Sequence, residues 1–276
     1  MLKNNMGKWI EEEKEIANLF LEFYRGLFSE DGCERGWIPT RQSWGLVDEE
    51  NWKKIGGEVS DIEVYSAFFQ MGGYKAPRID GFPAVFYNQN WELVGSLVTN
   101  FIKTLWRQPE RIGEVNETLV VLNPKVDKPE QVSQFRPIAL CNVIYKGLAK
   151  ILVNRLKPFL DRLISPYQTS FIPRRNIHDN IIVAKKVVHT MNRLQGNKGF
   201  MVIKIDLEKA YDRMSWSYIE KVLEEIELDE HVRKVIKGCV NSVKLSLMWN
   251  RKKGEELSSS RGLRQGDPLS PYLFVL

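Results

Sequence analysis

The 276-residue chain is 43% hydrophobic and 27% charged with a net charge of +5, a composition that is typical of a folded globular protein and excludes a disordered or fibrous chain. It has no apolar run of about 18 residues, and its N-terminus lacks the apolar core and cleavage site of a signal peptide, so we expect neither a membrane partner nor secretion. An intracellular location, in the cytoplasm or the nucleus, is therefore predicted.

Apolar periodicity and turn residues predict a chain that mixes helices with strands. Helices are expected over 9–28, 61–72, 90–107, 142–164 with an interruption at Pro158, 177–195, 215–227 and 229–240, and from Pro268 onwards. Strands are expected over 117–122, 200–205 and 243–249, and FMVIKI (200–205) has the strongest strand pattern. Residues 29–60 and 75–83 carry the glycines and prolines of irregular structure. The fold class is therefore α/β or α+β.

The basic charge is concentrated in the middle of the chain. Residues Phe101 to Lys204 hold 18 Lys and Arg against 7 Asp and Glu, which leaves the remainder of the chain net acidic. A polyanionic partner such as a nucleic acid would explain this asymmetry, and so would a solvated face that happens to be rich in lysine.

The three cysteines, Cys33, Cys141 and Cys239, are far apart in the sequence and form no C-x-x-C pair. We therefore expect reduced, mostly buried thiols, and neither a disulfide framework nor a zinc site.

Asp206 directly follows the predicted strand 200–205. An acid at the carboxyl end of a strand lies at the edge of a sheet where ligands bind. Its carboxylate is the hard oxygen ligand that Mg²⁺ prefers, and a pair of such ions can stabilise both reacting oxygens of a phosphoryl transfer. Asp206 could equally cap the helical segment that follows it.

The segment MVIKIDLEKAYDRMSW (201–216) resembles the first palm motif of reverse transcriptases, in which an acid that ends a strand is followed five residues later by an aromatic. The resemblance implies that Asp206 is catalytic and binds Mg²⁺. It also implies that Tyr211 lies under the sugar of the incoming nucleotide, where a rigid ring obstructs a 2′-hydroxyl. Packing of Tyr211 against the sheet is the simpler alternative.

The segment RGLRQGDPLSPYLF (261–274) resembles the second palm motif of the same family. The resemblance implies that Gln265 and Gly266 contact the nucleotide and the template base, with Gly266 allowing close backbone approach. The alternative is a plain Gly-Pro turn before a helix.

Two upstream segments resemble the fingers of non-LTR, LINE-type retrotransposon enzymes. In QFRPIALCNVIYKGLAKILVNRL (134–156), Arg136 and Lys146 match positions that face the triphosphate. In SPYQTSFIPRRNIHDNI (165–181), the residues that match positions expected to bind template backbone and bases are Gln168, Phe171 and Arg175. Each basic residue, taken alone, could be a solvated charge.

The chain departs from the family pattern at a few positions. Arg78 and Ile79 stand where Gly-Pro is usual, Asn123 replaces an apolar residue, and Arg174 replaces a glycine. Arg174 matters most, because a glycine at that position is expected to adopt a positive φ.

The resemblance implies a right-hand polymerase made of a helical N-terminal extension (1–74), fingers (75–199) and a partial palm (200–276). The aromatic-x-Asp-Asp hairpin and the thumb do not occur in this sequence. With Asp206 as the only clear ligand, we expect Mg²⁺ to bind weakly or not at all, and the chain to be inactive alone. The implied partners are an RNA template, a DNA primer and dNTPs, with no obligate protein partner evident.

Two alternatives remain open at this point. One is a non-catalytic RNA- or DNA-binding module derived from the fingers, which would bind with strong salt dependence but synthesise nothing. The other is a different metal-dependent phosphoryl-transfer enzyme that uses Asp206 together with Glu208 and Asp212.

Overall fold

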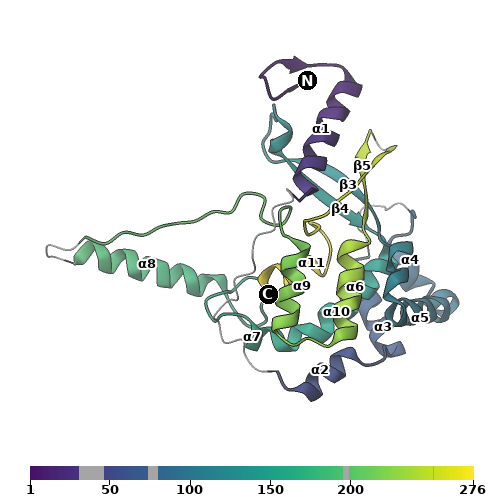
Figure 1. Ribbon diagram of the computed structural model, residues 1–276. Helices are drawn as coiled ribbons and strands as arrows, with labels where there is room; N and C mark the ends of the chain where they lie inside the picture. The colour runs from purple at the N-terminus through teal and green to yellow at the C-terminus, as the bar shows by residue number, and fades with distance from the viewer. Residues whose placement is uncertain (31–46, 74–79, 195–198, 251) are drawn as a thin grey trace.

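The computed structural model describes residues 1–30, 47–73, 80–194, 199–250 and 252–276. Helices and one larger sheet build the molecule, which confirms the predicted mixed class (Figure 1). Among the described residues, no helix is long and apolar enough to cross a membrane.

A four-stranded sheet joins segments that are far apart in the sequence. Its strands are β3 (Glu117–Pro124), β4 (Phe135–Cys141), β5 (Lys244–Trp249) and β6 (Lys252–Leu257), in the spatial order β4-β3-β5-β6. β3 runs antiparallel to β4 and parallel to β5. The β-branched and apolar run from Thr118 to Val121 suits this central position, because such side chains pack well on a pleated surface.

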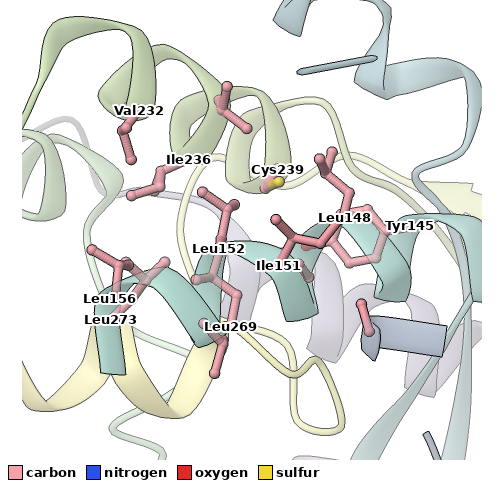
Figure 2. Close-up of a cluster of buried hydrophobic side chains, with 14 of the residues drawn as sticks. Tyr145, Leu148, Ile151, Leu152, Leu156, Val232, Ile236, Cys239, Leu269 and Leu273 are labelled. Atoms are coloured by element: carbon pink, nitrogen blue, oxygen red, sulfur yellow. The ribbon is translucent and has the colours of Figure 1, made fainter. Parts of the chain in front are cut away.

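Helix α6 (Val143–Leu156) is the centre of the helical body. Ten of its 14 residues are buried. Figure 2 shows its side chains between those of α10 (Glu230–Asn241) and those of Leu269 and Leu273 at the C-terminal end. The other helices of this body are α2 (Glu49–Gly56), α3 (Asp61–Phe69), α4 (Ala84–Gln89), α5 (Trp91–Arg107), α7 (Leu160–Leu163), α9 (Trp216–Glu225) and α11 (Ser270–Val275), with short 3-10 turns η1 (Pro109–Glu114), η2 (Val132–Gln134) and η3 (Lys157–Phe159).

One glycine sets how closely α3 approaches α6. A Cβ atom added at Gly147 would lie only 2.4 Å from the ring of Phe68, so the two helices can touch only because this position has no side chain. Gly147 is buried in α6, and Phe68 is a fully buried member of the main hydrophobic core.

The N-terminal segment packs on the sheet. After a small hairpin, β1 (Leu2–Lys3) and β2 (Trp9–Ile10), helix α1 (Glu13–Phe28) lays its apolar face over strands β3 and β5. Phe20 and Tyr24 of α1 share a buried cluster with Val120, Leu245 and Leu247. The predicted boundaries 1–74, 75–199 and 200–276 stay predictions; the sheet itself takes strands from the last two of these segments.

The expected strand over 200–205 is wrong. These residues form no strand, and their apolar side chains are exposed, for example Met201 by 80% and Ile205 by 78%. They continue from α8 (Ile177–Arg193), which projects from the rest of the molecule in Figure 1. We call α8 and residues 199–207 together the arm. A strand needs a neighbouring strand for its backbone hydrogen bonds, and no described segment lies beside this one as a partner.

The other predicted elements are mostly confirmed, including the break of the 142–164 helix around Pro158. Elements that the sequence did not predict are β1, β2, α4, β4 and β6, together with α2, which lies inside the stretch expected to be irregular. The helix expected over 9–28 begins only at Glu13, because Trp9 and Ile10 form β2. Cys141 and Cys239 are free and buried, as expected, and Cys33 lies outside the described residues, as do Arg78 and Ile79.

Candidate nucleotide and nucleic-acid site

Gln265 and Gly266 lie in the loop that precedes α11. The loop contacts β4, which is one of the two edge strands of the sheet, and the Ala139 N–H donates to the Gln265 carbonyl over 2.7 Å. Gly266 has a φ of +108°, and a Cβ atom there would lie 2.8 Å from the Ala139 carbonyl oxygen. Both observations require glycine at this position.

Tyr211 lies beside this loop, on the turn that follows the arm. Its carbonyl accepts a hydrogen bond of 2.8 Å from the Leu263 N–H. Its ring stacks on Phe274 of α11, with centroids 4.3 Å apart and an interplanar angle of 14°. Burial raises the pKa of its hydroxyl. Tyr211 is therefore half-buried and held near Gln265, and its ring already has an aromatic neighbour.

Asp212 is a buried carboxylate that contacts the Gln265 side chain. It is 4% exposed, and its Oδ1 accepts a hydrogen bond of 3.3 Å from Gln265 Nε2. Burial raises the pKa of Asp212 to about 6, although the hydrogen bond from Gln265 and the charges of Lys125 and Lys209 oppose the shift. A cavity of about 20 Å³ lies next to both side chains, roughly the space of one water molecule.

Asp206 is not part of this group. It lies on the arm and is exposed, whereas Asp212 is buried in the body. Glu208 forms an ion pair with Lys209, with nitrogen and oxygen 3.4 Å apart. Within the described ranges, no three His, Cys, Asp or Glu side chains are arranged to hold a metal ion. A single exposed carboxylate therefore does not fit the pair of magnesium ions that the resemblance implies.

Arg136 and Lys146 lie on adjacent elements. Arg136 is exposed on β4, opposite Asn123 of β3 and three residues from Ala139. Lys146 is on α6 and is only 9% exposed, so most of its stem is inside the body. Arg136 is therefore exposed on the strand that holds the Gln265 loop, whereas Lys146 is buried.

The three predicted template-binding residues lie in the loop before α8. Phe171 is 51% exposed, with a positive φ of 65°. The Arg175 guanidinium is turned inward: it pairs with Asp161 and donates to the carbonyls of Ile164 and Gln168. A guanidinium bound in this way organises the loop, and Phe171 presents the more accessible surface of the three.

Arg174 has a φ of +67°. The sequence predicted this conformation from the glycine that the family has at the position. An arginine in the left-handed region is strained, because its Cβ lies too close to the following carbonyl.

The sequence alone did not identify several residues of the site. Tyr145, Arg264 and Asp267 form a buried polar group directly behind Gln265 and Gly266. The only signal was the Arg-x-x-Asp spacing around Gln-Gly, because the partners come from distant parts of the chain.

Comparison with known proteins agrees with this arrangement. Residues 124–276 match the family described as reverse transcriptase (RNA-dependent DNA polymerase). The chain is 26% identical over 277 residues to the Transposon TX1 uncharacterized 149 kDa protein of Xenopus laevis, covering 98% of this chain and 21% of that protein. It is 27% identical over 291 residues to a retrovirus-related Pol polyprotein from the type-1 retrotransposable element R2 of Nasonia vitripennis, covering 99% of this chain and 26% of that protein.

The chain thus spans about a quarter or less of the length of these curated relatives. The match of the family to residues 124–276 includes every position predicted to touch nucleotide or nucleic acid, from Arg136 to Gly266.

Proposed function

Since the chain belongs to the reverse transcriptase family, we propose that it is the part of a LINE-type retrotransposon polymerase that carries the fingers and the first palm motifs. Its substrates are then dNTPs, and its partners an RNA template and a DNA primer. The observation that carries the proposal is the loop of Gln265 and Gly266, which is held against β4 and beside Tyr211 in the family's order of motifs.

We assign roles on this basis. Gln265 and Gly266 contact the nucleotide and the template base, Arg136 and Lys146 attract the triphosphate, and Tyr211 lies near the sugar. A guanidinium and an ammonium group suit this role because their positive charge attracts the negative phosphates. Gln168, Phe171 and Arg175 belong to the template side, with Phe171 stacking on a base.

We further propose that residues 1–276 do not synthesise DNA by themselves. Nucleotidyl transfer in this family would need two metal ions, and here Asp206 is exposed on the arm while Asp212 is buried against Gln265. This separation also argues against a different phosphoryl-transfer enzyme built on Asp206, Glu208 and Asp212.

Nucleotide binding tests the proposal. A fluorescent dATP analogue is titrated into the chain with an RNA template and DNA primer, and we expect Gln265→Ala to weaken its binding about tenfold, which corresponds to one well-placed hydrogen bond. Gln70→Ala, at the exposed end of α3, is the matched control and should leave the affinity unchanged. Equal affinity in the parent chain and Gln265→Ala would argue against the assignment.

A non-catalytic nucleic-acid-binding module is the second candidate. The arm favours it, because all but one of the charged groups on α8 are basic or histidine, namely His178, Lys185, Lys186, His189 and Arg193 against Asp179. This candidate predicts salt-dependent binding of an RNA–DNA hybrid with no dependence on Gln265. Titrating a labelled RNA–DNA hybrid into the chain at two salt concentrations measures this binding, and hybrid binding without binding of the dATP analogue would favour the second candidate.

A further inference from the structure

Arg264, which directly precedes Gln265, is bound on several sides inside the molecule. Its side chain is only 9% exposed. Its guanidinium donates to the side chains of Asn116 and Thr118, to the Cys239 carbonyl over 3.1 Å, and to Asp267 Oδ2 over 2.7 Å. Such a planar fork fixes orientation as well as position, since several donors point in set directions.

Tyr145 completes the surroundings of this guanidinium. The tyrosine ring lies beneath Arg264 at 4.3 Å, and its hydroxyl donates to the same Asp267 Oδ2 over 2.6 Å. The other oxygen of Asp267 accepts from the Leu269 N–H over 2.9 Å. A buried ion pair is stable only when its remaining donors and acceptors are satisfied, and here they are.

These contacts tie the loop to three other elements. Asn116 immediately precedes β3, Tyr145 belongs to α6, and Cys239 belongs to α10. Arg264 and Asp267 are thereby fixed on both sides of Gln265 and Gly266. The two residues between them have little freedom left, because Gly266 lies so close to Ala139 that even a Cβ would collide.

We propose that Arg264 is a positioning residue for nucleotide binding: it holds Gln265 and Gly266 in place from behind and does not itself touch the substrate. The inference rests on the proposed function. This role would explain why a buried arginine directly precedes Gln265 and Gly266. It would also make the nucleotide site depend on how β3, α6 and α10 pack together.

Arg155 on α6 provides a matched control. Its side chain is 10% exposed, pairs with Glu63, donates to the carbonyls of Ile55 and Gly57, and lies 4.7 Å from the Trp106 ring. The two arginines therefore have the same kind of surroundings. Arg155, however, ties α6 to the segment around α2 and α3 and makes no contact with the Gln265 loop.

The experiment compares Arg264→Lys with Arg155→Lys in the full chain. Both should lower stability to urea, since lysine cannot reproduce the fork. Only Arg264→Lys should weaken binding of the fluorescent dATP analogue, by about tenfold, and only it should speed hydrogen exchange at the Ala139 amide, which donates to Gln265. Thr118→Val, which removes one bond of the guanidinium, should move both readouts in the same direction and less far.

A double variant shows whether Arg264 acts through Gln265. In a Gln265→Ala background, adding Arg264→Lys should change dATP affinity by less than about twofold, because coupled residues are not additive. Full additivity, or equal affinity losses for Arg264→Lys and Arg155→Lys, would overturn the inference. If the parent chain binds no nucleotide, the proposed function fails. Hydrogen exchange at the Ala139 amide then still tests whether Arg264 positions the loop. Unchanged exchange in both Arg264→Lys and Thr118→Val would refute that role.

Discussion

Helices α6 and α8 both carry several apolar side chains, but they differ in how far those side chains are buried. Ten of the 14 residues of α6 are buried, whereas none of the 17 residues of α8 is. α6 lies between α10 and the C-terminal segment, while α8 stands away from the body as part of the arm (Figures 1 and 2). An apolar pattern predicts that a helix forms, but burial depends on a partner surface. The same contrast separates Gln265, which the body holds in place, from Asp206, which the arm leaves exposed.

The largest expected effect is a difference in the free energy of unfolding between two Leu→Ala variants, one in α6 and one at the end of α8. Leu152→Ala, in the fully buried centre of α6, should lower the free energy of unfolding by about 2–5 kcal/mol, because it removes buried methyl groups and leaves a cavity. Leu194→Ala follows α8, where the side chain is 51% exposed, and should change it by less than about 0.5 kcal/mol. Urea unfolding of both variants measures the difference. Equal losses would mean that the segment at the end of α8 is packed in solution.

The second prediction concerns the pH dependence of stability that the buried carboxyl group of Asp212 causes. The pKa of about 6 in the folded chain exceeds the usual value of 3.8, so the folded state retains a proton that the unfolded state releases. The stability contributed by this proton is complete below about pH 4 and is lost as the pH rises through about 6, a loss on the order of 3 kcal/mol.

Asp212→Asn removes this titration while keeping an acceptor for Gln265. We therefore expect the variant to be more stable than the parent chain above about pH 6, and the difference to shrink as the pH falls towards 4. Urea midpoints recorded across this range check the prediction. If the urea midpoints of the parent chain and the variant change with pH in parallel over the whole range, the Asp212 carboxyl is not buried as described.

The smallest effect is expected at Arg174, in the loop between the body and the arm. Arg174→Gly should raise the free energy of unfolding by about 1 kcal/mol or less, because glycine adopts the φ of +67° without strain but gains freedom in the unfolded chain. Arg174→Ala is the control: it removes the charge and keeps the strain, so it should not stabilise. If alanine stabilises as much as glycine, the arginine charge is responsible.

The sequence predicts most helices of the body because their apolar spacing and capping residues are local, although it misses α2 and α4. It fails at 200–205, where an apolar, β-branched run requires a neighbouring strand that local pattern cannot supply. It also misses β4, because Pro137 within the run argues against a strand, whereas β4 pairs with β3 in the structure.

The candidate site divides in the same way. Gln265, Gly266 and Tyr211 were found from their motifs, and the structure brings them together. The buried group around Arg264 could not be found, because Asn116, Tyr145 and Cys239 meet it only in the folded chain. The positive φ of Arg174 was predictable from a family glycine alone.

Primer extension tests the central claim most directly. The 276-residue chain is incubated with an RNA template, a labelled DNA primer, dNTPs and Mg²⁺, and the primer length is measured. We predict no extension, because Asp206 lies exposed on the arm and, within the described residues, belongs to no group of three side chains that could hold a metal ion. Template-dependent extension that requires Mg²⁺ and is lost in Asp206→Asn would contradict the account.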